Sequence, residues 1–358
     1  MLNSRHLIDL DHYTLEQIDD ILTLAKMIMN KPQYYTDSCH GKVMATLFYE
    51  PSTRTQMSFQ TAMLRLGGSV IGFDNPVNSS VSKGETLKDT VRVVSNYADI
   101  ITIRNPYEGA AKAASMYSRV PVINAGDGGH LHPTQTLTDI FTLKETKGTL
   151  EHLTVGLCGD LKYGRTVHSL IKTLCRYPGN RFVLISTKEL ALPQYLKDII
   201  VETGHQFQEI DHLTDAMPLL DVLYMTRIQQ ERFTSKAAYE QQKGIYVLDA
   251  PKLARAKYGL KILHPLPRVD EISQEIDDDP RAEYFNQTEY GMYARMALIL
   301  HMLDGSTKQL DTIPEGDDKH YCCNPKCITQ TEKYLPPAFY CHKDIWVCEY
   351  CEHAVDRE

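Results

Sequence analysis

The sequence contains no long apolar segment, because no run approaches the roughly 20 residues that a helix needs to span a bilayer. Residues 1–10 have neither the apolar core nor the cleavage pattern of a signal peptide. An excess of basic residues is also missing, since the net charge is −8. This charge argues against a surface for a nucleic-acid backbone. We therefore expect a cytoplasmic protein that binds neither membranes nor nucleic acid.

Cysteine is scarce in most of the chain. Only three of the nine cysteines fall in the first three hundred residues, whereas six fall in the last forty. This distribution excludes a secreted scaffold that is stapled evenly by disulfides. We expect a reduced main body followed by a metal-binding tail.

The 358 residues are 42% hydrophobic and 23% charged, which is ordinary globular composition and enough chain for two domains and a small appendage. Short apolar runs alternate with helical patterns in both halves, and this alternation favours parallel α/β sheets. The predicted strands cover residues 43–49, 69–73, 100–104, 120–124, 153–158, 181–186, 222–225, 246–248 and 261–263. The predicted helices cover residues 14–29, 57–66, 87–96, 134–146, 166–175 and a last segment to about 303. The predicted fold is two doubly wound parallel-sheet domains and a small C-terminal domain.

The most informative turn is Glu50-Pro51-Ser52-Thr53-Arg54-Thr55. It joins a predicted strand to a predicted helix, so its hydroxyls and its guanidinium lie where unpaired N–H groups and the helix dipole favour an anion. The turn therefore predicts a phosphate site. The simpler alternative is a helix cap followed by a solvated arginine.

Other informative residues also follow predicted strands. They are Arg104, Gly159, the pair Thr226 and Arg227, and His264. Ligands of doubly wound sheets bind beyond the carboxyl ends of the strands. A dinucleotide is weakly supported, because residues 159–170 lack the G-x-G-x-x-G spacing.

The tail contains two close pairs of thiols, Cys322-x4-Cys327 and Cys348-x2-Cys351. This spacing suits one tetrahedral structural zinc ion, and roughly forty residues rarely fold without a metal or disulfides. Cys323 could replace Cys322. Other side chains that could substitute or bind a second ion are Cys341, His342 and His353.

Several motifs together resemble the aspartate and ornithine carbamoyltransferase family. They are Phe48–Thr55 with Ser58-Phe59 and Leu66-Gly67-Gly68, His132–Leu137, Gly159–Leu170, Thr226–Arg232 and His264-Pro265-Leu266-Pro267. The last motif has the aspartate form, whereas ornithine enzymes resemble His-Cys-Leu-Pro. The resemblance implies the carbamoyltransferase fold and transfer of a carbamoyl group from carbamoyl phosphate to L-aspartate, an early step of pyrimidine biosynthesis. It implies no covalent intermediate and no catalytic cofactor.

The resemblance also implies the residues that bind carbamoyl phosphate. They are Ser52, Thr53, Arg54, Thr55, Ser79, Lys83, Arg104, His132, Gln135, Pro265 and Leu266. Ser79 and Lys83 would come from a neighbouring subunit, with Ser80 as an alternative to Ser79, so the active site implies a homotrimer and allows a dimer of trimers.

The residues implied for aspartate are Lys83, Arg165, Arg227, Gln229, Leu266 and Pro267. The implied catalytic residues are Arg54, Thr55, Lys83, Arg104 and His132, of which Thr55, Arg104 and His132 donate to the oxyanion. Two arginines near the second substrate suit a dicarboxylate better than a diamino acid.

The expected domains are a carbamoyl-phosphate domain (1–133, completed by a helix at about 290–308), an aspartate domain (134–289), a linker (309–320) and a zinc domain (321–358). The tail resembles the zinc domain of the aspartate carbamoyltransferase regulatory chain, which docks onto a catalytic subunit. We expect the fused tail to clamp neighbouring subunits or trimers. The alternatives are transfer to another amino acid such as ornithine, and a catalytically silent scaffold whose zinc module recruits partners.

Overall fold

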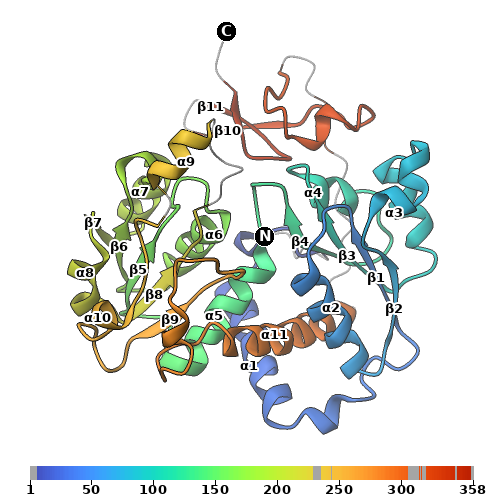
Figure 1. Cartoon of the computed structure of the whole chain (residues 1–358). Helices are drawn as coiled ribbons and strands as arrows, with labels where there is room; N and C mark the ends of the chain where they lie inside the picture. The colour runs from blue at the N-terminus through green and yellow to red at the C-terminus, as the bar shows by residue number, and fades with distance from the viewer. Residues whose placement is uncertain are drawn as a thin grey trace. The chain divides into compact units, whose positions relative to one another are not determined.

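The computed structural model describes residues 6–228, 235–242, 244–304, 314, 316, 320–342 and 345–355. The chain divides into two compact units, which we describe separately. Unit 1 consists of residues 1–134 and 292–358, and unit 2 consists of residues 135–291. Each unit contains one parallel sheet with helices, as Figure 1 shows, and unit 1 also carries a small antiparallel sheet near its C-terminal end. The predicted fold class is confirmed.

Unit 1 has a four-stranded sheet in the order β2-β1-β3-β4, and every neighbouring pair is parallel. Its elements before residue 130 are α1 (Leu15–Asn30), β1 (Val43–Phe48), α2 (Thr53–Arg65), β2 (Ser69–Phe73), α3 (Leu87–Val94), β3 (Ile100–Asn105), α4 (Ala110–Ser115) and β4 (Val122–Asp127). Helix α5 (Pro133–Lys147) begins in unit 1 and continues into unit 2.

The strand order of unit 1 fixes where a ligand can bind. The chain leaves β1 toward β2 on one side and returns to β3 on the other side, so β1 and β3 flank the point where the winding reverses. In open α/β sheets ligands bind at this point, beyond the carboxyl ends of the strands. The turn that contains Ser52 follows β1, and Arg104 is the fifth residue of the six-residue strand β3.

Unit 2 has a five-stranded parallel sheet in the order β7-β6-β5-β8-β9. Its elements are β5 (Thr154–Cys158), α6 (Arg165–Leu174), β6 (Arg181–Ile185), α7 (Gln194–Glu202), β7 (Gln206–Ile210), α8 (Leu213–Ala216), β8 (Val222–Met225), α9 (Lys236–Gln242), α10 (Ala250–Leu253), β9 (Lys261–Leu263) and α11 (Asn286–Leu303), which ends in unit 1. The winding reverses between β5 and β8, and Arg165 and Arg227 follow these two strands.

The predicted strand at residues 246–248 is wrong. Leu248 forms only an isolated bridge to Ile272, although Tyr246 and Leu248 are both buried in the core of unit 2. The alternating apolar residues signalled burial correctly. They do not signal a ladder, because the backbone of Leu248 bonds to Glu271 and Ser273 in a loop rather than to a strand.

The tail forms a small sheet on unit 1, with strands β10 (Phe339–His342), β11 (Ile345–Cys348) and β12 (Ala354–Val355) in antiparallel order. Trp346 of β11 stacks on His320 with ring centroids 4.3 Å apart. Most of the expected linker 309–320 and the end of the helix expected at 290–308 lie outside the described residues. Among the helices that the structure describes, none has the length and apolar character to cross a membrane.

The tail packs against α3 and α4 of its own chain. Buried Ile328, Leu335, Ala338 and Tyr350 share one apolar cluster with the alanines of α4. Polar contacts also join the tail to α3. Glu332 Oε1 and the hydroxyl of Tyr334 accept from the first backbone N–H groups of this helix at 3.0 and 2.9 Å. The tail therefore caps a helix N-terminus and covers one face of unit 1 (Figure 1).

Gly109 gives this interface a direct test. Its φ is +83°, and a Cβ there would lie 2.5 Å from the backbone oxygen of Tyr350 in the tail. We expect Gly109→Ala to destabilise the chain by about 2 kcal/mol or more, measured as a shift of the urea unfolding midpoint. Gly41→Ala is the matched control, because Gly41 has φ +73° and open space around it. Equal shifts of the unfolding midpoint for both variants would show that the close approach of Tyr350 to Gly109 does not contribute to stability.

Candidate functional site

The turn after β1 has the local geometry of an anion site. Helix α2 begins at Thr53, so its first N–H groups have no intrahelical acceptor. The hydroxyl of Ser52 donates to that of Thr55 across 3.1 Å, which sets both side chains on the same side of the turn. Thr53 and Arg54 are exposed, whereas Ser52 and Thr55 are half-buried. The four side chains of the predicted phosphate site thus occupy one helical turn.

Arg104 brings a second guanidinium to this turn. Only 9% of the residue is exposed. Its Nη2 pairs with Glu50 Oε2 at 3.2 Å, and its Nη1 donates to the backbone oxygen of Ala125 at 3.4 Å. Burial lowers the pKa of Arg104, the Glu50 carboxylate raises it, and the charge of nearby Arg54 lowers it again. Since an arginine stays protonated in proteins, this region carries two guanidinium groups, one of which is paired with the carboxylate of Glu50.

His132 lies directly before α5 and is almost fully buried. Its Nδ1 is 3.4 Å from the hydroxyl of Thr134. The loop between β2 and α3, which carries Ser79 and Lys83, contains two 3-10 turns, Pro76–Asn78 and Ser80–Lys83. The described hydrogen bonds of the Ser79 hydroxyl stay within this loop, because it donates to the Pro76 oxygen and accepts from Val81 N–H. Lys83 is exposed at the end of the second turn.

In unit 2 a buried carboxylate organises the residues around Gln135. Asp139 Oδ1 accepts from Gln135 Nε2 at 2.8 Å and from Gln287 Nε2 at 2.6 Å. Its Oδ2 accepts from the hydroxyl of Tyr224 at 2.9 Å. Gln287 in turn accepts from His264 N–H at 3.0 Å. A hydrogen-bonded chain therefore links the amide of Gln135 to the loop that follows β9.

That loop carries Pro265, Leu266 and Pro267, and His264 holds its shape. Leu266 N–H donates to His264 Nδ1 at 2.7 Å, so the imidazole proton is on Nε2 and is donated to Glu271 at 2.7 Å. Burial raises the pKa of Glu271, but the hydrogen bonds from His264 and from the loop backbone outweigh it and lower the pKa. Leu266 has φ +51° and precedes a cis peptide bond to Pro267.

The two predicted arginines for a second substrate follow neighbouring strands of unit 2. Arg165 is the first residue of α6 and Arg227 comes two residues after β8, and both are half-buried. The segments are joined because Asp160 N–H donates to the hydroxyl of Thr226 at 3.0 Å. Gln229, the third predicted residue of this region, lies outside the described residues.

The tail brings together Cys322, Cys327, Cys348 and Cys351. Their Sγ atoms all lie within 4.8 Å of one another, with 3.5 Å between Cys322 and Cys351 and 3.9 Å between Cys327 and Cys348. A tetrahedral zinc ion with bonds of about 2.3 Å has sulfur atoms about 3.8 Å apart. The four thiols fit such an ion. Cys323 and Cys341 are exposed and outside this group.

Sequence reasoning missed the residues that hold these groups in place. Glu50 and Asp139 are the main examples, since one pairs with Arg104 and the other connects three side chains. Asp139 left a weak signal, because it is four residues after Gln135 on one helix face. Its contact with Tyr224 joins residues 85 positions apart, and one sequence gives no sign of it.

Two family models match successive parts of the chain. Residues 5–145 match the carbamoyl-P binding domain of aspartate/ornithine carbamoyltransferases, and residues 151–302 match the Asp/Orn binding domain. The chain belongs to the aspartate/ornithine carbamoyltransferase family.

Relatives within the family are named for the aspartate branch. The aspartate carbamoyltransferase catalytic subunit of Clostridium perfringens is 57% identical over 304 residues, which are 85% of this chain and 99% of that protein. The catalytic subunit of Clostridium novyi is 55% identical over 303 residues, with 85% and 99% coverage.

Solved structures of aspartate transcarbamoylases are also similar to this chain. The catalytic subunit of M. jannaschii aspartate transcarbamoylase is 44% identical, with a TM-score of 0.80 and coverage of 86% of this chain and 100% of that one. The Trypanosoma cruzi enzyme, solved with carbamoyl phosphate and aspartate, is 38% identical, with a TM-score of 0.78 and coverage of 83% and 96%.

Proposed function

We propose that the chain is an aspartate carbamoyltransferase that transfers the carbamoyl group of carbamoyl phosphate to the α-amine of L-aspartate. The observation that carries this proposal is the pair of guanidinium groups at the start of α2, where Arg104 is buried beside the charge of Arg54. This arrangement fits a phosphate dianion. The kinship with aspartate-branch enzymes and the His264-Pro265-Leu266-Pro267 sequence support aspartate as the acceptor.

In the proposed reaction the neutral amine attacks the carbonyl carbon directly, the C–O bond to the phosphate breaks and phosphate leaves, and the amine gives up one proton to the departing phosphate or to water. Unit 1 would bind the phosphate through residues 52–55 and Arg104, with Ser79 and Lys83 added by a neighbouring subunit of a homotrimer. Thr55, Arg104 and His132 would donate to the developing oxyanion. In unit 2, Gln135 and the carbonyl groups of Pro265 and Leu266 would hold the carbamoyl amide. Loss of one oxyanion donor typically costs about 2.7 to 4 kcal/mol of transition-state stabilisation.

The second substrate would bind unit 2. We propose that Arg165 and Arg227 hold the two carboxylates of aspartate, with Lys83, Gln229, Leu266 and Pro267 completing the site. The position of Arg165 at the first turn of α6 supports this role, because the helix dipole and the guanidinium act on the same anion.

For the tail we propose one structural zinc ion bound by Cys322, Cys327, Cys348 and Cys351. Four thiolates close the coordination shell, so the ion would stabilise the tail and leave no position for a substrate. We also propose that the domains have the limits expected from the sequence, with a zinc domain that begins at residue 321.

The acceptor can be tested with an assay for the ureido product. We expect product from carbamoyl phosphate and aspartate and none from ornithine. Arg227→Ala should raise the KM for aspartate at least about tenfold, because a charge-assisted bidentate contact contributes more than about 1.4 kcal/mol. Arg176→Ala is a control on the same unit, outside the proposed site. Product from ornithine alone would contradict the aspartate assignment, and product from neither acceptor would contradict carbamoyl transfer to both.

A further inference from the structure

The loop between β4 and α5 carries His132, and a single carboxylate organises it. Asp127 Oδ1 accepts from Leu131 N–H at 3.0 Å and from Asn124 Nδ2 at 3.2 Å. Its Oδ2 accepts from Gly109 N–H at 2.8 Å and faces His130 Nδ1 at 3.2 Å. These contacts hold the backbone just before His132 and tie it to Gly109 at the start of α4 and to Asn124 of β4, so they fix where His132 lies directly before α5.

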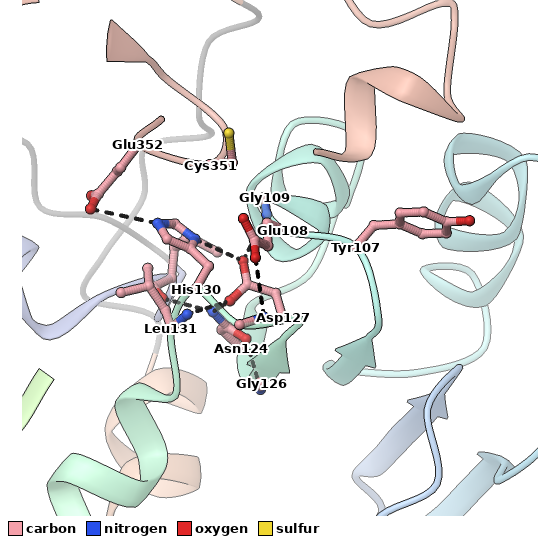
Figure 2. Close-up of polar contacts among 12 residues, drawn as sticks. Tyr107, Glu108, Gly109, Asn124, Gly126, Asp127, His130, Leu131, Cys351 and Glu352 are labelled. Carbon is pink, nitrogen blue, oxygen red and sulfur yellow. Dashed lines mark hydrogen bonds and ion pairs between the residues drawn. The ribbon is translucent and has the colours of Figure 1, made fainter. Parts of the chain in front are cut away.

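His130 connects this loop to the tail. Its Nδ1 faces Asp127, and its Nε2 faces Glu352 Oε2 at 3.5 Å, so the imidazole lies between two carboxylates (Figure 2). The His130 side chain is 10% exposed, whereas that of Glu352 is 40% exposed. The contact between His130 and Glu352 therefore crosses from the core of unit 1 to its cysteine-rich tail.

Glu352 is held in place by the cysteine turn. It follows Cys351 directly, its φ is +55°, and its N–H donates to the Cys348 oxygen at 2.9 Å. A left-handed conformation is uncommon for a residue with a side chain, so the turn and not the intrinsic preference of Glu352 defines where its carboxylate lies. The turn contains two of the four thiols that converge in the tail.

A second contact joins the same two regions. Glu108 Oε1 accepts from Gly129 N–H at 3.3 Å in the loop, and its Oε2 accepts from Asn324 Nδ2 at 2.6 Å in the tail. The backbone of Glu108 also bonds to Lys326 and Ile328. The loop before His132 is therefore anchored to the tail at two places, next to residue 129 and at His130.

We infer that Glu352 and His130 are positioning residues, through which the metal-loaded cysteine turn fixes the loop that carries His132 in the same chain. The inference rests on the proposed role of His132 at the carbamoyl group. It predicts that the tail affects the reaction without touching a substrate, and that removal of the exposed Glu352 carboxylate weakens this effect even while the Glu108 contacts remain.

Glu352→Gln tests the contact, because it keeps the shape of the side chain and leaves all four thiols. We expect kcat/KM for carbamoyl phosphate to fall about tenfold, within the usual range of coupling between sites, with zinc content unchanged. Glu349→Gln is the matched control. Glu349 lies three residues away and pairs with Lys112 of α4 at 3.3 Å, so it also joins tail to core but away from the loop. We expect wild-type kinetics for this control.

A double-mutant cycle separates positioning from general destabilisation. We expect His130→Asn to lower kcat/KM similarly, and Glu352→Gln to add nothing further in that background. Additive losses, or equal losses in the Glu349→Gln control, would overturn the inference.

Amide hydrogen exchange gives a readout that does not depend on catalysis. Residues 128–132 should exchange faster in Glu352→Gln than in wild type or Glu349→Gln, and removal of zinc by a chelator should have the same effect. Unchanged exchange of this loop in Glu352→Gln would overturn the inferred role of the contact in holding the loop, even if the enzyme is active. If the wild type formed no ureido product, the proposed function would fail, and the exchange result would still decide whether the tail positions the loop.

Discussion

Replacement of Arg54 by alanine is expected to reduce kcat/KM for carbamoyl phosphate by about 100- to 1,000-fold, the order of loss when one preorganised cationic or hydrogen-bond donor to a reacting group is removed. Arg54 lies in the first turn of α2, where we propose that the N–H groups of the helix and the buried Arg104 bind the same phosphate. The side chain is exposed, so its removal creates no cavity and leaves the fold intact. Steady-state kinetics with both substrates measure the loss.

Two further variants of α2 make this result specific. Arg54→Lys keeps the charge but loses the planar fork of donors, so we expect an intermediate loss. Arg65→Ala removes an exposed arginine from the last turn of the same helix and should leave the kinetics unchanged. Activity of Arg54→Ala within threefold of wild type would show that the phosphate binds elsewhere.

The second large effect is expected from the tail. Replacing Cys348 and Cys351 by serine removes two of the four converging thiols. In zinc-finger peptides, metal binding supplies about 10 to 16 kcal/mol of apparent folding free energy, so the double variant should lose the fold of residues 320–355 altogether. The apolar faces of α3 and α4 would then be exposed to water. Metal analysis, calorimetry and limited proteolysis of the full chain measure these losses.

The exposed cysteines provide the control for this experiment. Cys323→Ser and Cys341→Ser change thiols of the same tail that lie outside the converging group. We expect both variants to keep the metal and the wild-type melting temperature. A double variant that melts like wild type and resists protease across the tail would contradict a metal-dependent fold.

Strongly periodic segments of the fold could be predicted from the sequence. The helix expected over residues 14–29 is confirmed as α1, and Thr14 caps it, because its hydroxyl accepts from Gln17 N–H while the Gln17 side chain accepts from Thr14 N–H. The strand and helix around residues 50–55 are also confirmed. In these segments local preference and tertiary packing favour the same structure.

Weakly apolar segments were missed. The edge strand β7 is mostly polar, and its residues are half-buried or exposed, so it lacks the apolar run that marks a buried strand. Helix α4 has six residues and four alanines, too short for a helical period to show. Strand β7 forms because a neighbouring strand pairs with it, and α4 forms because the tail packs against it. A single sequence does not contain that information.

The candidate site shows the same division. Residues at strand ends could be named in advance, because parallel strands bring their carboxyl ends to one edge. The groups that hold the site in place could not, since the pairs of Glu50 with Arg104, of Asp139 with Tyr224 and of Glu352 with His130 form only through tertiary packing. The roles of the strand-end residues as ligands of carbamoyl phosphate and aspartate are predictions, which the kinetic experiments test.

Trp346 gives the tail its own optical reporter. It is the sole tryptophan of the chain, and it stacks on His320 within the cysteine-rich module. Intrinsic tryptophan fluorescence of the whole protein therefore comes from this module alone, whatever the state of the two parallel sheets. Undocking and refolding of the tail, and the binding of zinc added to its four thiols, can be followed in the intact enzyme without a label.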